Sequence, residues 1–361
     1  MLARMLSRIR LTLKQHRFET IAVVVLCLGL AAASLIEAYR LGAVQFPAGC
    51  VGGGVSAGVG GYPNPYDPSR PPTPCDLATQ RFSDIAWSFD MNLVRMFEQL
   101  LPFIVGIVFG AVLVAREIEQ GTAPLSWALA GSRTRWLLGK LLAVVVLIVP
   151  LLLIAGLAAD VRQGALVPGG SDSHASFQFY ADRGVFFVFW GLAALCGTVA
   201  LGTLMGRTLP AVLVALVVCV FARGLWEQAW NHTVLRQFAV MLDGGYNYAG
   251  TDLWVYQSDQ LYLDGKPWYG NIDAWWQAHE TCIDYTPDPS MAGDTGGKAV
   301  GGTICGPFDQ GTPEIPPTSA TYVIHGDRYW GVVALEGAAL LAGSVFCAAV
   351  ALFWVNRRRP Y

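Results

Sequence analysis

The sequence motifs typical of nucleotide hydrolysis and of zinc-dependent proteolysis are incomplete in this chain. A phosphate-binding loop needs Gly-x-x-x-x-Gly-Lys-Ser/Thr. The nearest string, Gly293-Asp-Thr-Gly-Gly-Lys298, is one residue too short and lacks the hydroxyl residue. A zinc-protease pattern needs a second histidine three residues after Glu280, and His279-Glu280 stands alone. We therefore expect no catalytic residue, no metal and no cofactor in this chain.

The segment Val114–Lys140 combines charged residues with a short apolar stretch. Its two glutamates continue a helix that Gly121 ends, Thr122 can cap a second short helix over 123–130, and Ser132 can cap the next apolar segment. A short apolar helix held between two spans suits docking into a partner's groove. The alternative is a helix lying flat on the lipid. The candidate site residues in this segment are Glu117, Glu119, Gly121, Thr122, Leu125, Trp127 and Arg133.

Ionisable residues near the ends of apolar segments form a second candidate set. A buried carboxylate is costly without a partner, so Glu336 is a functional candidate. Glu37, Arg40, Glu98 and Arg223 lie near the outer ends of other apolar segments. Some of these charges are expected to pair at a dimer interface or to line an outer gate. The alternative, which we favour for Glu37, Arg40 and Glu98, is anchoring by side chains that reach water.

Six apolar runs must position these residues. The chain is 54% hydrophobic and only 14% charged, against about 25% charged in soluble domains. Uncharged runs that cross about 30 Å of hydrocarbon must be helices, because each backbone amide has to bond within its own segment. The predicted spans are 20–41, 97–115, 136–159, 184–206, 207–226 and 330–355.

Basic residues set the predicted orientation. More than half of the 24 Lys and Arg residues lie in four short segments on one side of the predicted spans. Because cytoplasmic loops carry the excess of Lys and Arg, we place 1–19, 116–135 and the 356–361 tail in the cytoplasm of a cell whose inner membrane the chain spans. A cleaved signal peptide over 1–34 is the alternative, but the apolar run exceeds the usual length of about 7–15 residues.

The remaining segments are expected outside the cytoplasm. Residues 42–96 form a Gly/Pro-rich loop, 160–183 a short loop and 227–329 a larger folded insertion. Within the insertion, 252–257 has strand character and 274–280 has helical character. The predicted fold class is thus an all-α polytopic membrane protein with six transmembrane helices, an N-terminal amphipathic interfacial helix and a mixed, disulfide-bearing extracytoplasmic insertion before the last helix.

The cysteines follow this topology. Four lie in predicted spans, and the other four, Cys50, Cys75, Cys282 and Cys305, lie in predicted outer loops. An even pair in each of two loops suggests two disulfides in an oxidising compartment. We prefer the within-loop pairings, which close the shorter loops, among three possible connectivities. Reduced or metal-bound thiols are the alternative, although no Cys-x-x-Cys spacing supports metal.

The segment between spans two and three resembles that of permease subunits of type 2 ATP-binding-cassette exporters. Those subunits carry a Glu-x-Glu-x-Gly-Thr segment, a short helix, a Ser-Arg pair and a Gly-Lys, within a similar six-span layout. Two departures are Ala130, where the family often has proline, and a longer loop before span six. The matching residues are Glu117, Glu119, Gly121, Thr122, Ser132, Arg133, Gly139 and Lys140.

The resemblance implies that 123–130 is a coupling helix that docks on a separate cytoplasmic ATPase subunit. ATP and Mg would bind to that partner, and the permease would work with a second copy or a paralogue. The spans contain few charged residues, and this scarcity of charge favours a hydrophobic or amphipathic substrate.

Two other function classes remain open. A membrane-anchored sensor or receptor would use 227–329 as a ligand-binding domain, and a kinase gene beside this one, rather than an ATPase gene, would favour it. A membrane enzyme acting on lipid-linked substrates ranks last, because no acid/base or metal cluster is evident.

Overall fold

A computed structural model describes residues 17–47, 74–166, 184–242, 253–263, 266–268, 281–285, 302–306 and 318–357 of the chain. It contains six helices long and apolar enough to cross a membrane, which confirms the predicted number. The core of each predicted span lies within one of them. These helices are α2 (Arg17–Gly42), α4 (Phe89–Glu119), α6 (Arg133–Ala165), α7 (Gly184–Met205), α8 (Thr208–Ala229) and α11 (Tyr329–Arg357).

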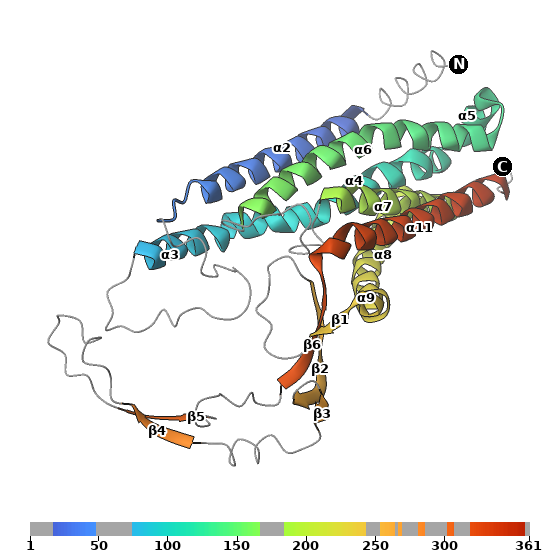
Figure 1. Cartoon of the computed structure of the whole chain (residues 1–361). Helices are drawn as coiled ribbons and strands as arrows, with labels where there is room; N and C mark the ends of the chain where they lie inside the picture. The colour runs from blue at the N-terminus through green and yellow to red at the C-terminus, as the bar shows by residue number, and fades with distance from the viewer. Residues whose placement is uncertain are drawn as a thin grey trace. The chain divides into compact units, whose positions relative to one another are not determined.

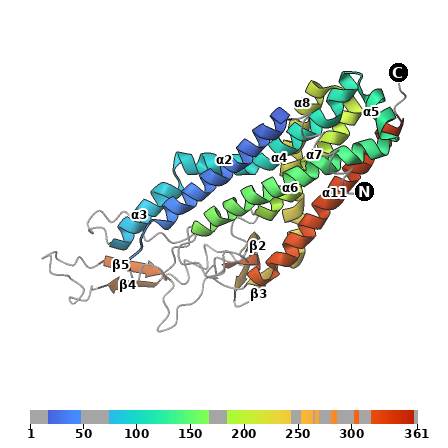
Figure 2. The same ribbon diagram turned by 90° about the horizontal axis from the view of Figure 1, so that it is seen from above.

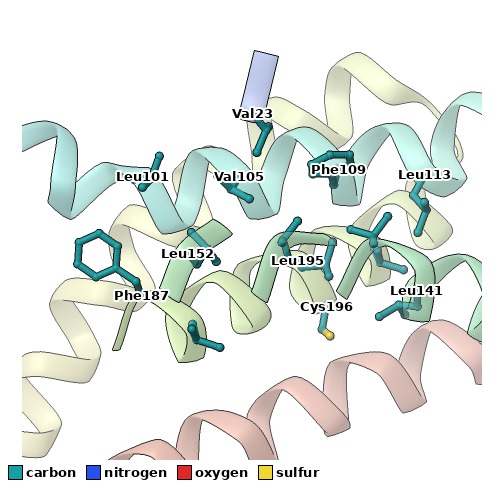
Figure 3. Packing of buried hydrophobic residues seen from close by; sticks show 14 of the residues in the cluster. Val23, Leu101, Val105, Phe109, Leu113, Leu141, Leu152, Phe187, Leu195 and Cys196 are labelled. Carbon is teal, nitrogen blue, oxygen red and sulfur yellow. The ribbon is translucent and has the colours of Figure 1, made fainter. Parts of the chain in front are cut away.

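The chain divides into two compact units, and the six helices belong to the first of them. Within this helical unit α4 packs against α7, α2 against α6, and α11 against α7 (Figures 1 and 2). The shared core contains large apolar side chains such as Leu101, Phe109, Leu152 and Leu195 (Figure 3). Of the six helices, α7 is the most buried and α8 the least. The bundle is therefore built around α4, α6 and α7.

Glycines let α4 approach α7 closely. A Cβ atom on Gly106 would lie 2.7 Å from the backbone nitrogen of Leu195, and one on Gly110 would lie 2.8 Å from the Leu195 carbonyl oxygen. Small residues four apart on one helix face allow such backbone contacts between membrane helices. Larger residues at these two positions would push the helices apart.

A helix in the predicted first outer loop was missed in the sequence. Helix α3 (Pro74–Ala86) lies in the predicted first outer loop, and α4 begins at Phe89, where the Ser88 hydroxyl accepts a hydrogen bond from the Met91 backbone nitrogen. The apolar side of α3 contributes Phe82 to a small cluster with Leu41 and Met91. The predicted N-terminal amphipathic helix lies, over residues 1–16, outside the described part of the chain.

The second unit, Trp230–His325, contains strands. A short π-helix η3 (Trp230–Leu235) and helix α9 (Arg236–Phe238) open it. Strands β1 (Val240–Leu242), β6 (Thr318–Ile324), β2 (Leu253–Leu263) and β3 (Lys266–Trp268) form a four-stranded antiparallel sheet in that order. Strands β4 (Thr281–Tyr285) and β5 (Gly302–Gly306) form a separate antiparallel pair. A 3₁₀ turn, η4 (Gly326–Arg328), then leads into α11.

The predicted strand character of 252–257 agrees with β2, whereas the predicted helical segment 274–280 lies outside the described residues. Cys282 and Cys305 are direct partners in the β4–β5 register. Cys50 lies outside the described residues, and Cys75 lies in the first turn of α3. The free thiols among the described residues are those of Cys27, Cys196, Cys219 and Cys347, all in apolar helices.

Candidate functional site

A short helix, α5 (Ala123–Ala130), joins the C-terminal end of α4 to the N-terminal end of α6. Gly121 and Gly131 bound it with φ angles of 69° and 74°, a left-handed conformation that favours glycine. Ser132 caps α6 as predicted, because its hydroxyl accepts a hydrogen bond from the Arg135 backbone nitrogen at 3.2 Å. Residues directly next to α5, namely Gly121, Gly131 and Ser132, therefore determine where it begins and ends.

The predicted cap by Thr122 is wrong. Thr122 occupies the N-cap position of α5, but its side chain makes no capping hydrogen bond to that helix. Instead, the Thr122 hydroxyl donates to the Glu117 carbonyl oxygen at 3.4 Å, and the Thr122 backbone nitrogen donates to the same oxygen at 3.1 Å. The hydroxyl turns back to α4 because the last carbonyls of a helix have no partner within it.

Two large apolar residues of α5, Leu125 and Trp127, differ in their surroundings. Leu125 is 67% exposed. Trp127 instead packs edge-on against Trp136 of α6, with ring centroids 6.1 Å apart. The Arg133 guanidinium lies 4.5 Å from the centroid of the Trp127 ring, within the range of a cation–π contact. Trp127 therefore holds α5 on α6, while Leu125 stays open to a partner.

Glu117 forms an ion pair with Lys140 across the α4–α6 contact. Both side chains are largely buried, and the Lys140 Nζ atom lies 4.8 Å from the centroid of the Trp136 ring. The same Nζ atom lies 3.5 Å from the Leu113 carbonyl oxygen. This ion pair joins α4 to α6 directly beside α5.

Glu119 reaches a different helix. Its Oε2 atom accepts a hydrogen bond of 2.9 Å from the backbone nitrogen of Thr208, the first residue of α8. A carboxylate at this position satisfies one of the free N–H groups of the helix start and faces the positive end of its dipole. At the same end, Arg116 pairs with Glu19 of α2 at 3.4 Å.

Arg133 connects α5 to the last helix. Its Nη1 atom donates to the carbonyl oxygens of Val355 and Asn356, at 3.2 Å each, near the C-terminal end of α11. The side chains of Thr134 and Asn356 also hydrogen-bond. A cation is favoured at this position, because the last carbonyls of a helix are unpaired and carry its negative dipole end.

All seven candidate residues of the Val114–Lys140 segment therefore lie at one end of the helical unit, which we call the α5 end (Figures 1 and 2). Sequence reasoning missed the partners on other helices, namely Glu19, Thr208, Val355 and Asn356. No local pattern marks them, since each is defined only by the packing of distant segments. Glu37, Arg223 and Glu336 are not part of this end.

The opposite end of the same helices holds a buried ion pair that was also missed. Arg162 of α6 binds Glu98 of α4 through two bonds, Nε to Oε1 at 3.0 Å and Nη2 to Oε2 at 2.5 Å. The hydroxyl of Ser34 on α2 donates to Glu98 Oε1 at 2.7 Å. Both charged side chains are 1% exposed. Glu98 is thus not a water-reaching anchor, because α6 continues to Ala165 and brings an arginine to it.

Glu37 and Arg40 behave in two ways. Arg40 Nη1 lies 2.9 Å from Glu37 Oε1 and 3.8 Å from Asp90 Oδ2 of α4. The Arg40 side chain is 53% exposed, in line with an anchor that reaches water, whereas that of Glu37 is 7% exposed.

Among the described residues, no group of three or more His, Cys, Asp or Glu side chains could hold a metal ion.

A family model described as ABC-2 membrane transporter related matches residues 20–230, more than half of the chain. The chain belongs to this family. No curated protein and no solved structure matches it. As an ABC-2-related chain with several apolar helices, it is a multi-pass membrane protein and a membrane component of a transporter. The match covers α4, α5 and α6 with the candidate residues between them, and it ends before α11.

Proposed function

We propose that this chain is the permease subunit of an ATP-driven exporter that moves a hydrophobic or amphipathic substrate. A separate cytoplasmic ATPase subunit would bind ATP and Mg and hydrolyse the nucleotide, and α5 would be the helix that docks on it. A second copy of the permease, or a paralogue, would complete the transporter. The family relationship supports this assembly, since ABC-2 membrane components normally work with such an ATPase.

The attachment of α5 is the observation that carries the proposal. Leu125 is open to a partner, while Trp127 and Arg133 fix α5 to α6 and to the carbonyl end of α11. Glu119 links the end of α4 to the start of α8. A push on α5 would therefore reach four apolar helices through side chains that are already in contact. Such contacts are what a mechanical link between ATPase and membrane helices requires.

The α5 end would face the cytoplasm, with both chain termini on that side of the inner membrane. Arg116, Arg133 and Arg357 lie in the helix ends that meet there, and an excess of basic residues is typical of cytoplasmic loops. Glu37, Arg223 and Glu336 would belong to the outer half of the helices, at a gate or a subunit interface.

Two disulfides, Cys50–Cys75 and Cys282–Cys305, would stabilise the segments outside the cytoplasm. The direct pairing of Cys282 with Cys305 in the β4–β5 register supports the second of them, because antiparallel partners have Cα atoms at distances that a disulfide can span.

Affinity purification of the tagged chain in mild detergent tests the proposed partner. We expect a soluble ATPase to co-purify with the parent and to be lost from Leu125→Asp, because a carboxylate would have to be desolvated in an apolar groove. Leu77→Asp, at an exposed leucine of α3, is the matched control and should retain the ATPase. Equal recovery from both variants would show that α5 is not the docking helix.

A receptor remains the second candidate because Trp230–His325 forms a compact unit of its own. In that case the purified chain would be recovered alone or with a kinase. The ligand would then be sought on the strands of that unit.

A further inference from the structure

The start of α6 and the end of α11 lie side by side at the α5 end (Figure 2). The side chains of Thr134 and Asn356 join them through hydrogen bonds of 3.3 and 3.4 Å. The two helices run antiparallel, because α6 begins where α11 ends. An α-helix turns by about 100° per residue, so the residue that follows each of these two lies on the same side of the contact. Those residues are Arg135 and Arg357.

This side of the contact faces out of the helical unit. Arg135 and Arg357 are both exposed, and the Arg357 guanidinium lies 4.6 Å from the centroid of the Phe353 ring. Exposed apolar side chains continue the same side of both helices at helical spacing from the two arginines. They are Leu142 and Val146 of α6, and Phe346 and Phe353 of α11. The outer side of the α6–α11 contact therefore combines two cations at the helix ends with an apolar surface beside them.

The charge on this side is positive. The sequence contains no Asp or Glu in residues 120–159 or in residues 337–361. Arg135 lies in the first turn of α6, where a cation is unfavourable beside the positive end of the helix dipole unless an anion lies next to it. Other carboxylates of the α5 end contact different helices, as described above. They are Glu19, Glu117 and Glu119.

We propose that Arg135 and Arg357 bind the phosphate of an anionic phospholipid, whose acyl chains lie along the exposed apolar side of α6 and α11. Anionic headgroups attract basic residues at the cytoplasmic surface of a membrane, and the proposal rests on the cytoplasmic placement of the α5 end given above. The bound lipid would hold the end of α11 against the start of α6. It would do so directly beside Arg133, which contacts α5 through Trp127.

Native mass spectrometry of the purified chain in detergent, titrated with dioleoylphosphatidylglycerol, tests the proposal. Dioleoylphosphatidylcholine, with the same acyl chains and a zwitterionic headgroup, is the matched probe and should bind more weakly. We expect Arg135→Gln and Arg357→Gln each to weaken binding of the anionic lipid about fivefold, the contribution of one basic residue near a membrane surface. Binding of the zwitterionic lipid should stay as in the parent, which separates a lost charge from a lost fold.

An arginine of the same end outside the α6–α11 contact provides the control. Arg207 is exposed between α7 and α8, and Arg207→Gln should bind the anionic lipid as the parent does. Arg135→Lys keeps the charge and should retain most of the binding. The proposal is overturned if both lipids bind equally, if Arg135→Gln and Arg357→Gln bind as the parent does, or if Arg207→Gln weakens binding as much as they do. These measurements use the permease alone, so a failure to capture an ATPase leaves them unaffected.

Discussion

Two ion pairs join α4 to α6, one near each end of the helices, and they are built differently. Glu98 and Arg162 share two hydrogen bonds and are 1% exposed, with Ser34 as a third member. Glu117 and Lys140, beside α5, have side chains that are 15% and 10% exposed. The Glu98–Arg162 pair has a fixed geometry, whereas the Glu117–Lys140 pair is more accessible. This difference suits a pair of helices that pivots at Glu98–Arg162 and is displaced at Glu117–Lys140.

The two ion pairs lie about 28 Å apart along α4, by the rise of about 1.5 Å per residue. Glutamate comes from α4 and the cation from α6 in both pairs. The helices are therefore held together over the full apolar core. A displacement of α5 would tilt the two helices as one body rather than separate them, which is what transmission to the outer side requires.

The largest expected effect comes from breaking the buried ion pair. Glu98→Ala leaves Arg162 without its carboxylate in a site with no access to water, and should lower the free energy of unfolding by about 3–5 kcal/mol. The loss should appear as a lower melting temperature of the purified chain. Asp90→Ala is the control, since Asp90 lies 3.8 Å from an exposed Arg40 and should cost about 1 kcal/mol or less.

The double variant Glu98→Leu, Arg162→Met sharpens this result. It removes both charges while roughly keeping volume, and should recover most of the lost stability because no buried charge is left unpaired. If the double variant were as unstable as Glu98→Ala, the two residues would not act as a pair.

An intermediate effect is expected at the other ion pair. Lys140→Met removes the partner of Glu117, whose side chain is 15% exposed and thus less completely buried than that of Glu98, so the loss should be smaller, about 1–3 kcal/mol. ATPase activity stimulated by substrate in the assembled transporter should fall more than stability does. Lys140→Arg keeps the charge and should retain most of both. A loss of stability equal to that of Glu98→Ala would remove the proposed difference between the two ends.

Much of the helical unit could be predicted from sequence because hydrocarbon imposes helices on long apolar runs. The six spans and the cap at Ser132 required only local patterns. The close contact at Gly106 and Gly110 also has a sequence signal, glycines four apart in an apolar run. Helix α3 was missed because its polar face resembles a loop.

The site was predicted only in part, because its partners come from distant segments. Glu117 and Glu119 stand out as charges next to a span, but nothing near them in sequence indicates Lys140 or Thr208 as the groups that they bind. Arg162 falls in the predicted loop 160–183, because apolar composition alone ends the predicted span at residue 159. A charged residue that follows an apolar run can lie in water beyond the helix, or it can lie in a continuing helix and form a buried ion pair. The local sequence is the same in both cases.

The smallest change in stability is expected at Glu119, which joins α4 to α8. Its carboxylate is exposed and accepts one hydrogen bond from the Thr208 backbone nitrogen. Glu119→Ala should leave membrane insertion and the melting temperature near those of the parent, because water can satisfy the freed N–H group. The hydrogen bond between the end of α4 and the start of α8 would nevertheless be lost.

This variant therefore separates coupling from stability more cleanly than the ion pairs do. Substrate-stimulated ATPase activity in the assembled transporter should fall in Glu119→Ala. It should fall less in Glu119→Gln, whose amide oxygen can still accept from Thr208 but no longer carries the charge that favours the helix start. Normal stimulated activity in Glu119→Ala would show that α8 is not driven through this contact. Displacement of α5 would then reach the other helices through Trp127 on α6 and through Arg133 at the end of α11.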